Sequence, residues 1–394
     1  MNNLSFFLLS IVQTLLRVLP FPCSTGLIKI GNPGRNAPVL LTGNFRLTVE
    51  RVRRALKGID AYLLVANSRG VNVWCAAMGG HLTNHDVVSV LKTSGIGKLV
   101  DHREVILPQL AAPGIESKII HHKTGWRVVW GPVYATAIPQ FLDNGREKTL
   151  EMRTVRFAWP QRLEMAVAWA FPISLLSLLV LPFWREGVFP LVGFVWGSAC
   201  FIFLCFPLYE GRLGSIEKNV GFIFFDFGRR GVPLLLWIFF MLDIVGYSML
   251  TGNFSWALAF RWGLSSLIVL LILGFDLMGS TPIYKSGLHE DRLLRIELDA
   301  ERCKGVGFCE QVCPINVFRI DHDRRLAFLP RAGQCVQCGA CVVQCPFDAL
   351  HFRGPNGDVV APDTIRRFKL NLLGNRKVVA RPVESEFRGQ ANNY

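Results

Sequence analysis

The chain has 394 residues, a length that predicts two or three domains, and 51% of them are hydrophobic, which is high for a soluble protein. Its net charge of +14 is spread over loops and the C-terminal segment. The sequence has no basic stripe with interleaved aromatic residues, so we do not expect a nucleic-acid partner. The long apolar runs instead favour a lipid bilayer as the partner of the basic loops.

The N-terminal segment, residues 1–29, carries an apolar run from Leu4 to Leu19 that contains Gln13 and Arg17. It lacks the basic start of a signal peptide. We expect an interfacial amphipathic helix here, and a buried domain helix is the alternative.

Residues 30–155 alternate strand-like and helix-like runs, which predicts an α/β layered domain with helices on a largely parallel sheet. Ala61–Ala66 is wholly apolar, as expected of a strand buried on both faces. Thr83 and Asp86 have the spacing of a capping box and predict a helix start, and Gly95 fits the end of that helix. The other predicted elements are strands at 38–43, 71–75, 104–107 and 127–130 and helices at 49–57 and 135–142.

Cys75 is placed by this pattern at the end of the strand 71–75, just before a glycine turn and a helix. Ligand sites in parallel sheets lie beyond the carboxyl ends of the strands. Two alanines and, after Met78, two glycines leave room for a bulky planar ligand, and Trp74 can line its pocket. The alternative is that Cys75 is a small buried core residue.

The stretch Asn72–Ala77 is similar to the signature of the mercury-methylation corrinoid protein family, which itself resembles the corrinoid domain of the acetyl-CoA-pathway corrinoid iron–sulfur protein. The flanks at 31–34, 41–44, 63–65, 106–114 and 131–133 agree with it. The resemblance implies a bound corrinoid (cobalamin) with Cys75 as the lower axial ligand of its cobalt. The cofactor-binding residues that it implies are Asn72, Trp74, Cys75, Ala76 and Ala77.

The sequence departs from that family at Met78-Gly79, where the family has glycine and lysine. The lost cation puts mercury as a substrate in doubt. His81 and His85 lie close by as alternative ligands, and we interpret both as ordinary helix-start residues.

Four long apolar runs lie within residues 160–282, and each can span about 30 Å of hydrocarbon. They predict a four-helix transmembrane region with a partial element at 220–227; the runs are Met165–Phe183, Val188–Tyr209, Val232–Leu250 and Trp256–Met278. The Lys and Arg distribution predicts a multi-pass protein of the cytoplasmic (inner) membrane, with both soluble ends facing the cytoplasm. For Asp243 and Arg261, which interrupt the runs, we expect a structural ion pair or a snorkelling arginine.

Residues 290–355 contain seven cysteines with the spacing of an α+β two-cluster ferredoxin domain. The second run is complete and consists of Cys335, Cys338, Cys341 and Cys345, followed by Pro346. The first run, 32 residues upstream, consists of Cys303, Cys309 and Cys313, and Val306 stands where its remaining cysteine should be. Because these ligands are thiolates, they imply a reducing compartment.

In two-cluster ferredoxins the fourth cysteine of each run ligates the other cluster. Cys335, Cys338, Cys341 and Cys313 therefore predict one complete [4Fe–4S] site. Cys303, Cys309 and Cys345 remain for a second site, which is a three-iron cluster, a four-iron cluster with a non-cysteine ligand, or empty. A [3Fe–4S] or open-site cluster is favoured, because an empty site would not explain three retained thiolates.

The C-terminal segment, residues 356–394, contains no cysteine. It therefore lacks the metal-delivering cysteine pair of the ferredoxin that works with the corrinoid family named above. We interpret its basic stretch Arg366–Arg381 as solvated or membrane-facing.

Three functions fit this organisation. The first is a membrane-anchored corrinoid and iron–sulfur protein, in which a reduced electron donor feeds the ferredoxin domain and a thiolate-ligated cobalt carries a methyl group from a donor to an acceptor that the sequence does not name. Such a protein would be methyltransferase-like. The second is the narrower mercury methyltransferase, and the third is a membrane-bound electron-transfer protein with a vestigial corrinoid pocket.

Overall fold

The structure is a computed structural model of the whole chain, and it describes residues 2–17, 19–209, 231–274, 294–354, 357–371 and 374–377. For 231–233, 368–371 and 374–377 only the backbone is described. The chain divides into two compact units: residues 1–18 with 157–293, and residues 19–156 with 294–394. Within the second unit we call residues 19–156 the head and residues 294–377 the iron–sulfur module.

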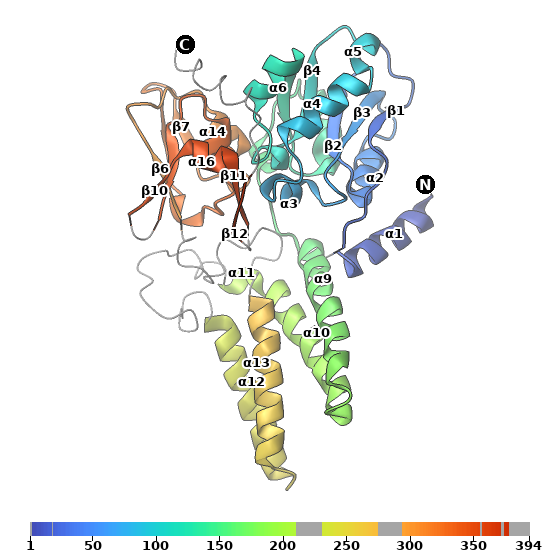
Figure 1. Cartoon of the computed structure of the whole chain (residues 1–394), viewed down its shortest axis with the longest axis vertical. Helices are drawn as coiled ribbons and strands as arrows, with labels where there is room; N and C mark the ends of the chain where they lie inside the picture. The colour runs from blue at the N-terminus through green and yellow to red at the C-terminus, as the bar shows by residue number, and fades with distance from the viewer. Residues whose placement is uncertain are drawn as a thin grey trace. The chain divides into compact units, whose positions relative to one another are not determined.

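The head is built on a five-stranded sheet with the strand order β1-β3-β2-β4-β5 (Figure 1). Four strands run parallel, and β1 pairs antiparallel with β3 at one edge. This confirms the predicted α/β sheet. The strands are β1 (Gly26–Ile30), β2 (Val39–Gly43), β3 (Ala61–Ala66), β4 (Glu104–Pro108) and β5 (Arg127–Gly131).

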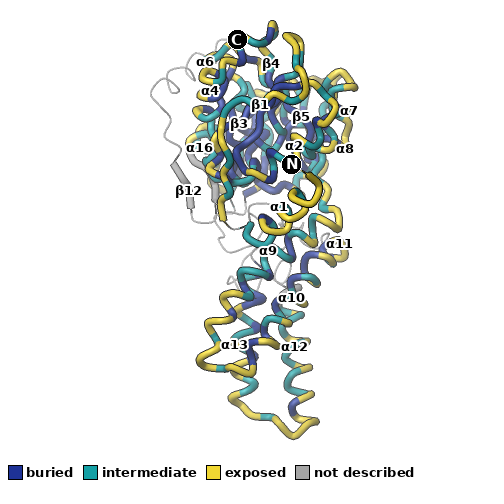
Figure 2. The backbone as a smooth tube through the Cα atoms, turned by 90° about the vertical axis from the view of Figure 1, so that its right-hand side faces the viewer, coloured by how far each residue is buried: buried dark blue, intermediate teal, exposed yellow. Residues whose placement is uncertain are grey.

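The head helices cover both faces of the sheet. Every residue of β3 is buried, as its apolar run predicts, and the strand is dark blue in Figure 2. The capping box of Thr83 and Asp86 is present, with the Thr83 N–H donating to the Asp86 carboxylate over 2.8 Å. The helices are α2 (Arg46–Ala55), α3 (Val73–Met78), α4 (Asn84–Thr93), α5 (Ile96–Leu99), η1 (Gln109–Ala111), α6 (Ser117–Thr124), η2 (Ala135–Ala137), α7 (Ile138–Asp143) and α8 (Leu150–Arg153).

One prediction for the head was wrong. Residues 71–75 are not a strand, because Asn72 caps a helix there and its side-chain oxygen accepts from the Cys75 N–H at 3.0 Å. The helix predicted for segment 1–29 is present as α1 (Asn3–Leu15), but the segment also contains the start of a strand that was not predicted, since β1 begins at Gly26. The pattern of apolar residues does not predict β1, because it is a short edge strand that is only half-buried.

The cysteine-bearing part of the iron–sulfur module lies between strands of one antiparallel sheet, ordered β10-β9-β6. β6 pairs with β9, with Ile296 opposite Phe352, and this pairing brings the two ends of the cysteine-bearing segment together. Its elements are β6 (Arg295–Leu298), α14 (Phe308–Val312), β7 (Arg319–Asp321), β8 (Leu326–Phe328), η8 (Ala332–Gln334), α15 (Ala340–Gln344), β9 (Leu350–Arg353), β10 (Val359–Val360), α16 (Pro362–Arg367), β11 (Phe368–Asn371) and β12 (Gly374–Lys377).

The head and the iron–sulfur module share one continuous hydrophobic core. Leu64 and Leu107 of the head sheet belong to the same buried cluster as Val342 and Phe352 of the module. The opposite face of the sheet packs separately against α2 and α7, around Leu63 and other buried side chains. The two parts are therefore packed together through apolar side chains as well as through the polar contacts described below.

The other unit is helical and contains α1 (Asn3–Leu15), α9 (Trp159–Ser177), η3 (Leu178–Val180), η4 (Arg185–Gly187), α10 (Val188–Leu204), α11 (Phe206–Tyr209), α12 (Gly231–Leu250) and α13 (Trp256–Leu273). The Arg162 guanidinium donates to the Leu204 carbonyl over 2.7 Å and so satisfies the end of α10. The rings of Trp184 and Trp262 pack edge to face with centroids 4.9 Å apart. Many apolar side chains point outward, among them Phe189, which is 84% exposed.

Among the described helices, three are long and apolar enough to cross a membrane: Trp159–Val180, Arg185–Leu204 and Trp256–Leu273. The prediction of four spans was wrong by this measure, because the apolar stretch Leu234–Leu250 is shorter. Asp243 and Arg261 are both exposed and form no ion pair with each other, so the predicted pair was also wrong. The predicted element at 220–227 lies outside the described residues.

Candidate functional site

The cysteine-bearing segment of the iron–sulfur module repeats its backbone every 32 residues. Gly305 and Gln337 both have positive φ, at 64° and 55°. Gly307 and Gly339 also match, at 80° and 76°, and each precedes a short helix. The missing cysteine has therefore not altered the path of the first loop.

The two short helices end alike. Cys313 follows α14 with φ −72° and ψ 115°, and Cys345 follows α15 with φ −67° and ψ 117°. This extended exit turns each of these cysteines away from its own run. It is the local geometry that lets a fourth thiol serve the neighbouring cluster, as in two-cluster ferredoxins.

The thiols gather in two groups. Cys341 is influenced electrostatically by Cys335, Cys338 and Cys313, and only last by Cys309. Cys309 in turn is influenced by Cys345 and Cys303. These are the two ligand sets that the crossed arrangement predicts from the sequence.

The three-thiol group lines a hollow with about 340 Å³ of empty space, counting the part open to solvent. Cys303, Cys309 and Cys345 form part of its wall, and Val306 and Lys304 form another part. The remaining lining is glycine and apolar side chains. A compact inorganic group held by thiolates is chemically suited to such a wall.

Backbone amides point at the cysteine sulfurs. An amide N–H that donates to sulfur stabilises the thiolate form that a metal ligand requires. The donor–acceptor distances are 3.2 Å from Val317 to Cys313, and 3.4 Å from Ala327 to Cys303, from Gln337 to Cys335 and from Ala349 to Cys345.

Burial works against ionisation of the same thiols. It raises the pKa of Cys309 to about 12 and raises the pKa of Cys341 well above its usual range. The buried sulfurs therefore need positive iron beside them to become thiolates. Gln337 is 1% exposed, and within the described structure its amide nitrogen and oxygen have no partner, which leaves the nitrogen available to a cluster sulfide.

Within the described ranges, no three His, Cys, Asp or Glu side chains converge on a point where they could hold a single metal ion. All eleven cysteines lie in those ranges, and none forms a disulfide. Each iron of a cluster takes one thiolate from the protein, and the thiols of this module lie in the two groups described above. The residues present therefore fit iron–sulfur clusters.

Cys75 lies in the first turn of α3, the helix that follows the carboxyl end of β3. It is half-buried, whereas the neighbouring Ala76 and Ala77 are fully buried. Trp74 is 6% exposed, and its indole N–H has no partner among the described residues. A half-buried thiol next to two small buried residues would suit a thiolate ligand to the cobalt of a corrinoid in its donor chemistry.

The histidines near Cys75 differ in position. His81 is half-buried and lies near Gly79, where an added Cβ would be 3.2 Å from its ring. His85 is exposed on α4. The backbone of β11 also runs beside α3.

A loop of the head, Ala112–Glu116, contacts both α3 and the iron–sulfur module, and we call it the docking loop. A Cβ added at Gly114 would lie 2.8 Å from the Ala77 Cα and 2.5 Å from the Leu82 carbonyl oxygen. On its other side the loop accepts from Gln344 of α15, whose amide nitrogen lies 2.8 Å from the Ala112 carbonyl oxygen. It therefore links α3, which contains Cys75, to α15, which contains Cys341 and is followed by Cys345.

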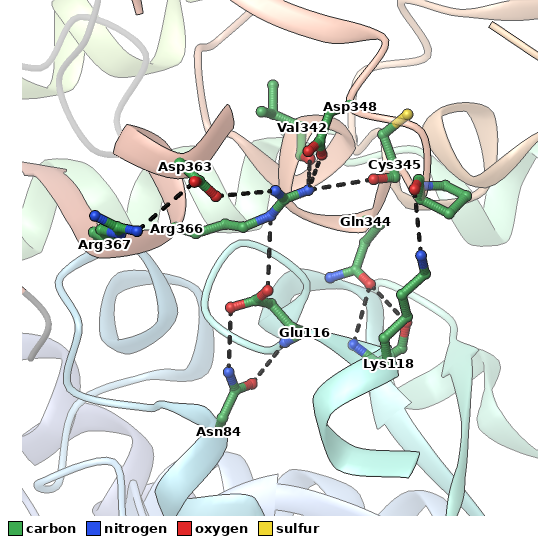
Figure 3. A network of polar contacts seen from close by, with 12 residues as sticks. Asn84, Glu116, Lys118, Val342, Gln344, Cys345, Asp348, Asp363, Arg366 and Arg367 are labelled. Carbon is green, nitrogen blue, oxygen red and sulfur yellow. Dashed lines mark hydrogen bonds and ion pairs between the residues drawn. The ribbon is translucent and has the colours of Figure 1, made fainter. Parts of the chain in front are cut away.

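Arg366 joins the docking loop to the module, as Figure 3 shows. Its side chain is 9% exposed and lies 3.7 Å from the Glu116 carboxylate, which is held by Asn84. It also pairs with Asp348 and donates to the Cys345 carbonyl over 3.3 Å. The prediction of a solvated basic tail was wrong at this residue, because Arg366 is nearly buried and one of its acidic partners, Glu116, lies 250 residues away in the sequence.

A second set of polar contacts lies at α14. The Lys148 ammonium donates to the Gln109 amide oxygen at 2.7 Å and to the Gln311 carbonyl at 2.9 Å. Arg153 pairs with Glu310 at 3.2 Å. Burial, and then the charge of Arg153, lowers the pKa of Lys148 to about 7.

Sequence reasoning missed the docking residues Gln344, Glu116 and Arg366. One signal was present for Gln344, because its counterpart 32 residues upstream is Val312, a buried core residue. A glutamine at such a position indicates a specific polar contact. No comparable signal marks Glu116, whose partner is 250 residues away in the sequence.

Two family models match parts of this chain. Residues 14–142, which contain the head sheet and Cys75, match the CO dehydrogenase/acetyl-CoA synthase delta subunit. Residues 302–350, which contain all seven clustered cysteines, match a 4Fe-4S dicluster domain. These matches support a corrinoid-protein-like head joined to a ferredoxin-type iron–sulfur domain.

Known proteins similar to the head are acetyl-CoA decarbonylase/synthase complex gamma subunits. The identity is 40% over 127 residues for Methanothermobacter thermautotrophicus and 35% over 134 residues for Methanocaldococcus jannaschii, which is 32% and 34% of this chain. For Archaeoglobus fulgidus it is 35% over 127 residues, 32% of this chain. The chain spans only 27% of the length of each of these relatives.

Proposed function

We propose that this chain is a membrane-anchored corrinoid and iron–sulfur protein. Its iron–sulfur module delivers low-potential electrons to a cobalt held by the Cys75 thiolate, and that cobalt carries a methyl group to an acceptor outside the chain. A reduced partner supplies the electrons, and a separate donor supplies the methyl group.

The observation that carries this proposal is the docking loop. One short segment of the head packs on Ala77, next to Cys75 in α3, and bonds to Gln344 between two cluster cysteines. A buried, hydrogen-bonded contact of this kind holds donor and acceptor in one geometry. The face of α15 that bears Gln344 is covered by the docking loop, which favours the head over a separate protein as the electron acceptor.

The cysteine groups support two clusters. We assign a [4Fe–4S] cluster to Cys313, Cys335, Cys338 and Cys341. We assign a second cluster, [3Fe–4S] or open at one corner, to Cys303, Cys309 and Cys345. The amide donors described above stabilise the thiolate form and so offset part of the cost of burying these sulfurs beside iron.

At the head site the chain's own residues position one sulfur. The Asn72 side chain fixes the first turn of α3 through the Cys75 N–H, and Ala76 and Ala77 anchor the helix in the core. A bound corrinoid would supply a cobalt that takes up a methyl group when reduced. A thiolate ligand donates electron density to that cobalt and favours release of the methyl group to a soft electrophile.

Membrane anchoring rests on the helical unit. Its three long apolar helices carry many outward-facing Phe and Leu side chains, and a soluble monomeric protein rarely exposes so large an apolar surface to water. We therefore place the chain in the cytoplasmic membrane with both soluble parts on the reducing side, where thiolate ligands persist.

The proposal is tested by anaerobic reconstitution of the full chain with cobalamin, followed by visible and EPR spectra of the cobalt. Cys75→Ala is expected to remove the sulfur-ligand features. Cys23→Ala is the matched control, because Cys23 is another half-buried head cysteine. If wild type binds no corrin, or if both variants give the wild-type cobalt spectrum, the proposed corrinoid role is wrong and electron transfer alone remains.

Mercury methylation is a narrower form of the same chemistry. A methylmercury assay with reductant and methyl donor addresses it. We expect little or no product, because the sequence has Met78-Gly79 where the resembling family has glycine and lysine.

A further inference from the structure

The corner of the second cluster site that lacks a cysteine opens to solvent. Val306 occupies the position that Cys338 occupies in the other copy, because the flanking backbone is the same in both. Val306 is 47% exposed, and Lys304 beside it is also exposed. A cluster held by the other three thiols would therefore present its fourth corner at the surface.

The wall of this hollow offers no substitute ligand. None of its lining residues is Asp, Glu or His. Apart from the three cysteines, Lys304 has the only polar side chain among them, and an ammonium has no lone pair to give to iron. A four-iron cluster with a protein-derived oxygen or nitrogen ligand does not fit these residues.

We propose that the second cluster has an exchangeable iron at the corner facing Val306, and that this iron takes its fourth ligand, a small thiolate, from solution. The site binds and releases one ferrous ion: a [4Fe–4S]²⁺ cluster gives a [3Fe–4S]⁰ cluster and Fe²⁺, and the solution thiolate leaves together with that iron, so atoms and charge balance without an oxidant. The Lys304 ammonium attracts the anionic ligand to this corner.

This inference rests on the proposed cluster assignments and is independent of the corrinoid. It separates two roles within one module. The complete cluster, with four protein thiolates, holds its iron and passes electrons. The open cluster responds to the supply of ferrous iron and small thiols, because filling or emptying that corner converts it between its four-iron and three-iron forms.

The test uses the full chain, reconstituted anaerobically with iron and sulfide in detergent. A chelator removes loosely held iron, and ferrous iron enriched in the Mössbauer-active isotope is then added. Wild type is expected to take up this label at a single site, whereas Val306→Cys, which supplies a fourth thiolate, is expected to take up none. Val306→Ala is the matched control and should take up the label as wild type does.

EPR gives a second readout. After chelation and oxidation with ferricyanide, wild type should show the signal of an oxidised three-iron cluster, and Val306→Cys should lack it. Added 2-mercaptoethanol should shift the spectrum of the reduced wild-type cluster and leave that of Val306→Cys unchanged.

The inference is overturned if Val306→Cys exchanges iron as wild type does, or if both wild-type clusters load and neither exchanges. It also fails if only the complete cluster loads, since the three-thiol site is then empty. Loss of both clusters in wild type would instead refute the proposed function. If Val306→Cys fails to fold, as judged by loss of the signal of the complete cluster, the wild-type result decides: label uptake at one site supports the exchangeable iron, and no uptake overturns it.

Discussion

Arg366→Ala is expected to loosen the contact between the head and the iron–sulfur module. The Arg366 guanidinium and the Glu116 carboxylate are 9% and 14% exposed, so the substitution removes a positive charge from beside a nearly buried carboxylate. Removing one member of a buried ion pair costs about 3–5 kcal/mol. Asn84 still donates to Glu116, which favours the lower end, about 3 kcal/mol.

Arg367→Ala is the matched control. Arg367 is the next residue, is 47% exposed and pairs with the half-exposed Asp363 at 3.8 Å. An exposed pair of this kind contributes less than about 1 kcal/mol. Both variants remove one positive charge from the same helix, so any difference between them reports burial and docking.

Amide hydrogen exchange on the full chain measures the effect. Loss of about 3 kcal/mol from docking should speed exchange roughly a hundredfold in the first turn of α6 and in α15, where opening requires separation of the two parts. The variant Glu116→Gln keeps the size of the side chain and should shift exchange in the same direction by less. Equal exchange in Arg366→Ala and Arg367→Ala would refute the reasoning.

Three further predictions concern the same contact. Gly114→Ala places a Cβ 2.5 Å from a carbonyl oxygen and should cost about 1–3 kcal/mol, measured by thermal unfolding, whereas Gly34→Ala, with open space around it, should cost little. Gln344→Met leaves two buried carbonyls of the docking loop unpaired, at about 1–3 kcal/mol each, and should speed amide exchange in that loop. Because the folded protein holds the pKa of Lys148 near 7, below the usual 10.5, the unfolded chain binds more protons than the folded protein above pH 7. The free energy of unfolding of wild type should therefore rise with pH over about pH 7–9. Lys148→Met should lose this slope, and the exposed control Lys118→Met should keep it.

Much of the architecture could be predicted from local pattern. The wholly apolar run Ala61–Ala66 could only be a strand buried on both faces, and the Thr83–Asp86 box marked a helix start. The spacing of the cysteines suggested their division into two groups, because the 32-residue repeat is a property of the sequence itself.

What could not be predicted depends on contacts between distant residues or on one cap. The run 71–75 is mostly apolar, as in a buried strand, yet the Asn72 side chain accepts from the Cys75 N–H and caps a helix. Arg366 belongs to a basic stretch by composition, and only the fold brings Glu116 to it. Asp243 and Arg261 show the converse, since comparable predicted depth did not make them a pair.

The docking loop also has a kinetic consequence. Because the faces of α15 and α16 that hold Gln344 and Arg366 are covered by the head, a freely diffusing redox partner cannot use them. Under the proposed function, electron delivery to the head would then be a first-order event whose rate is independent of protein concentration, as for any tethered pair of fixed geometry. Diffusion would limit only the step in which an outside donor meets the uncovered surface of the iron–sulfur module.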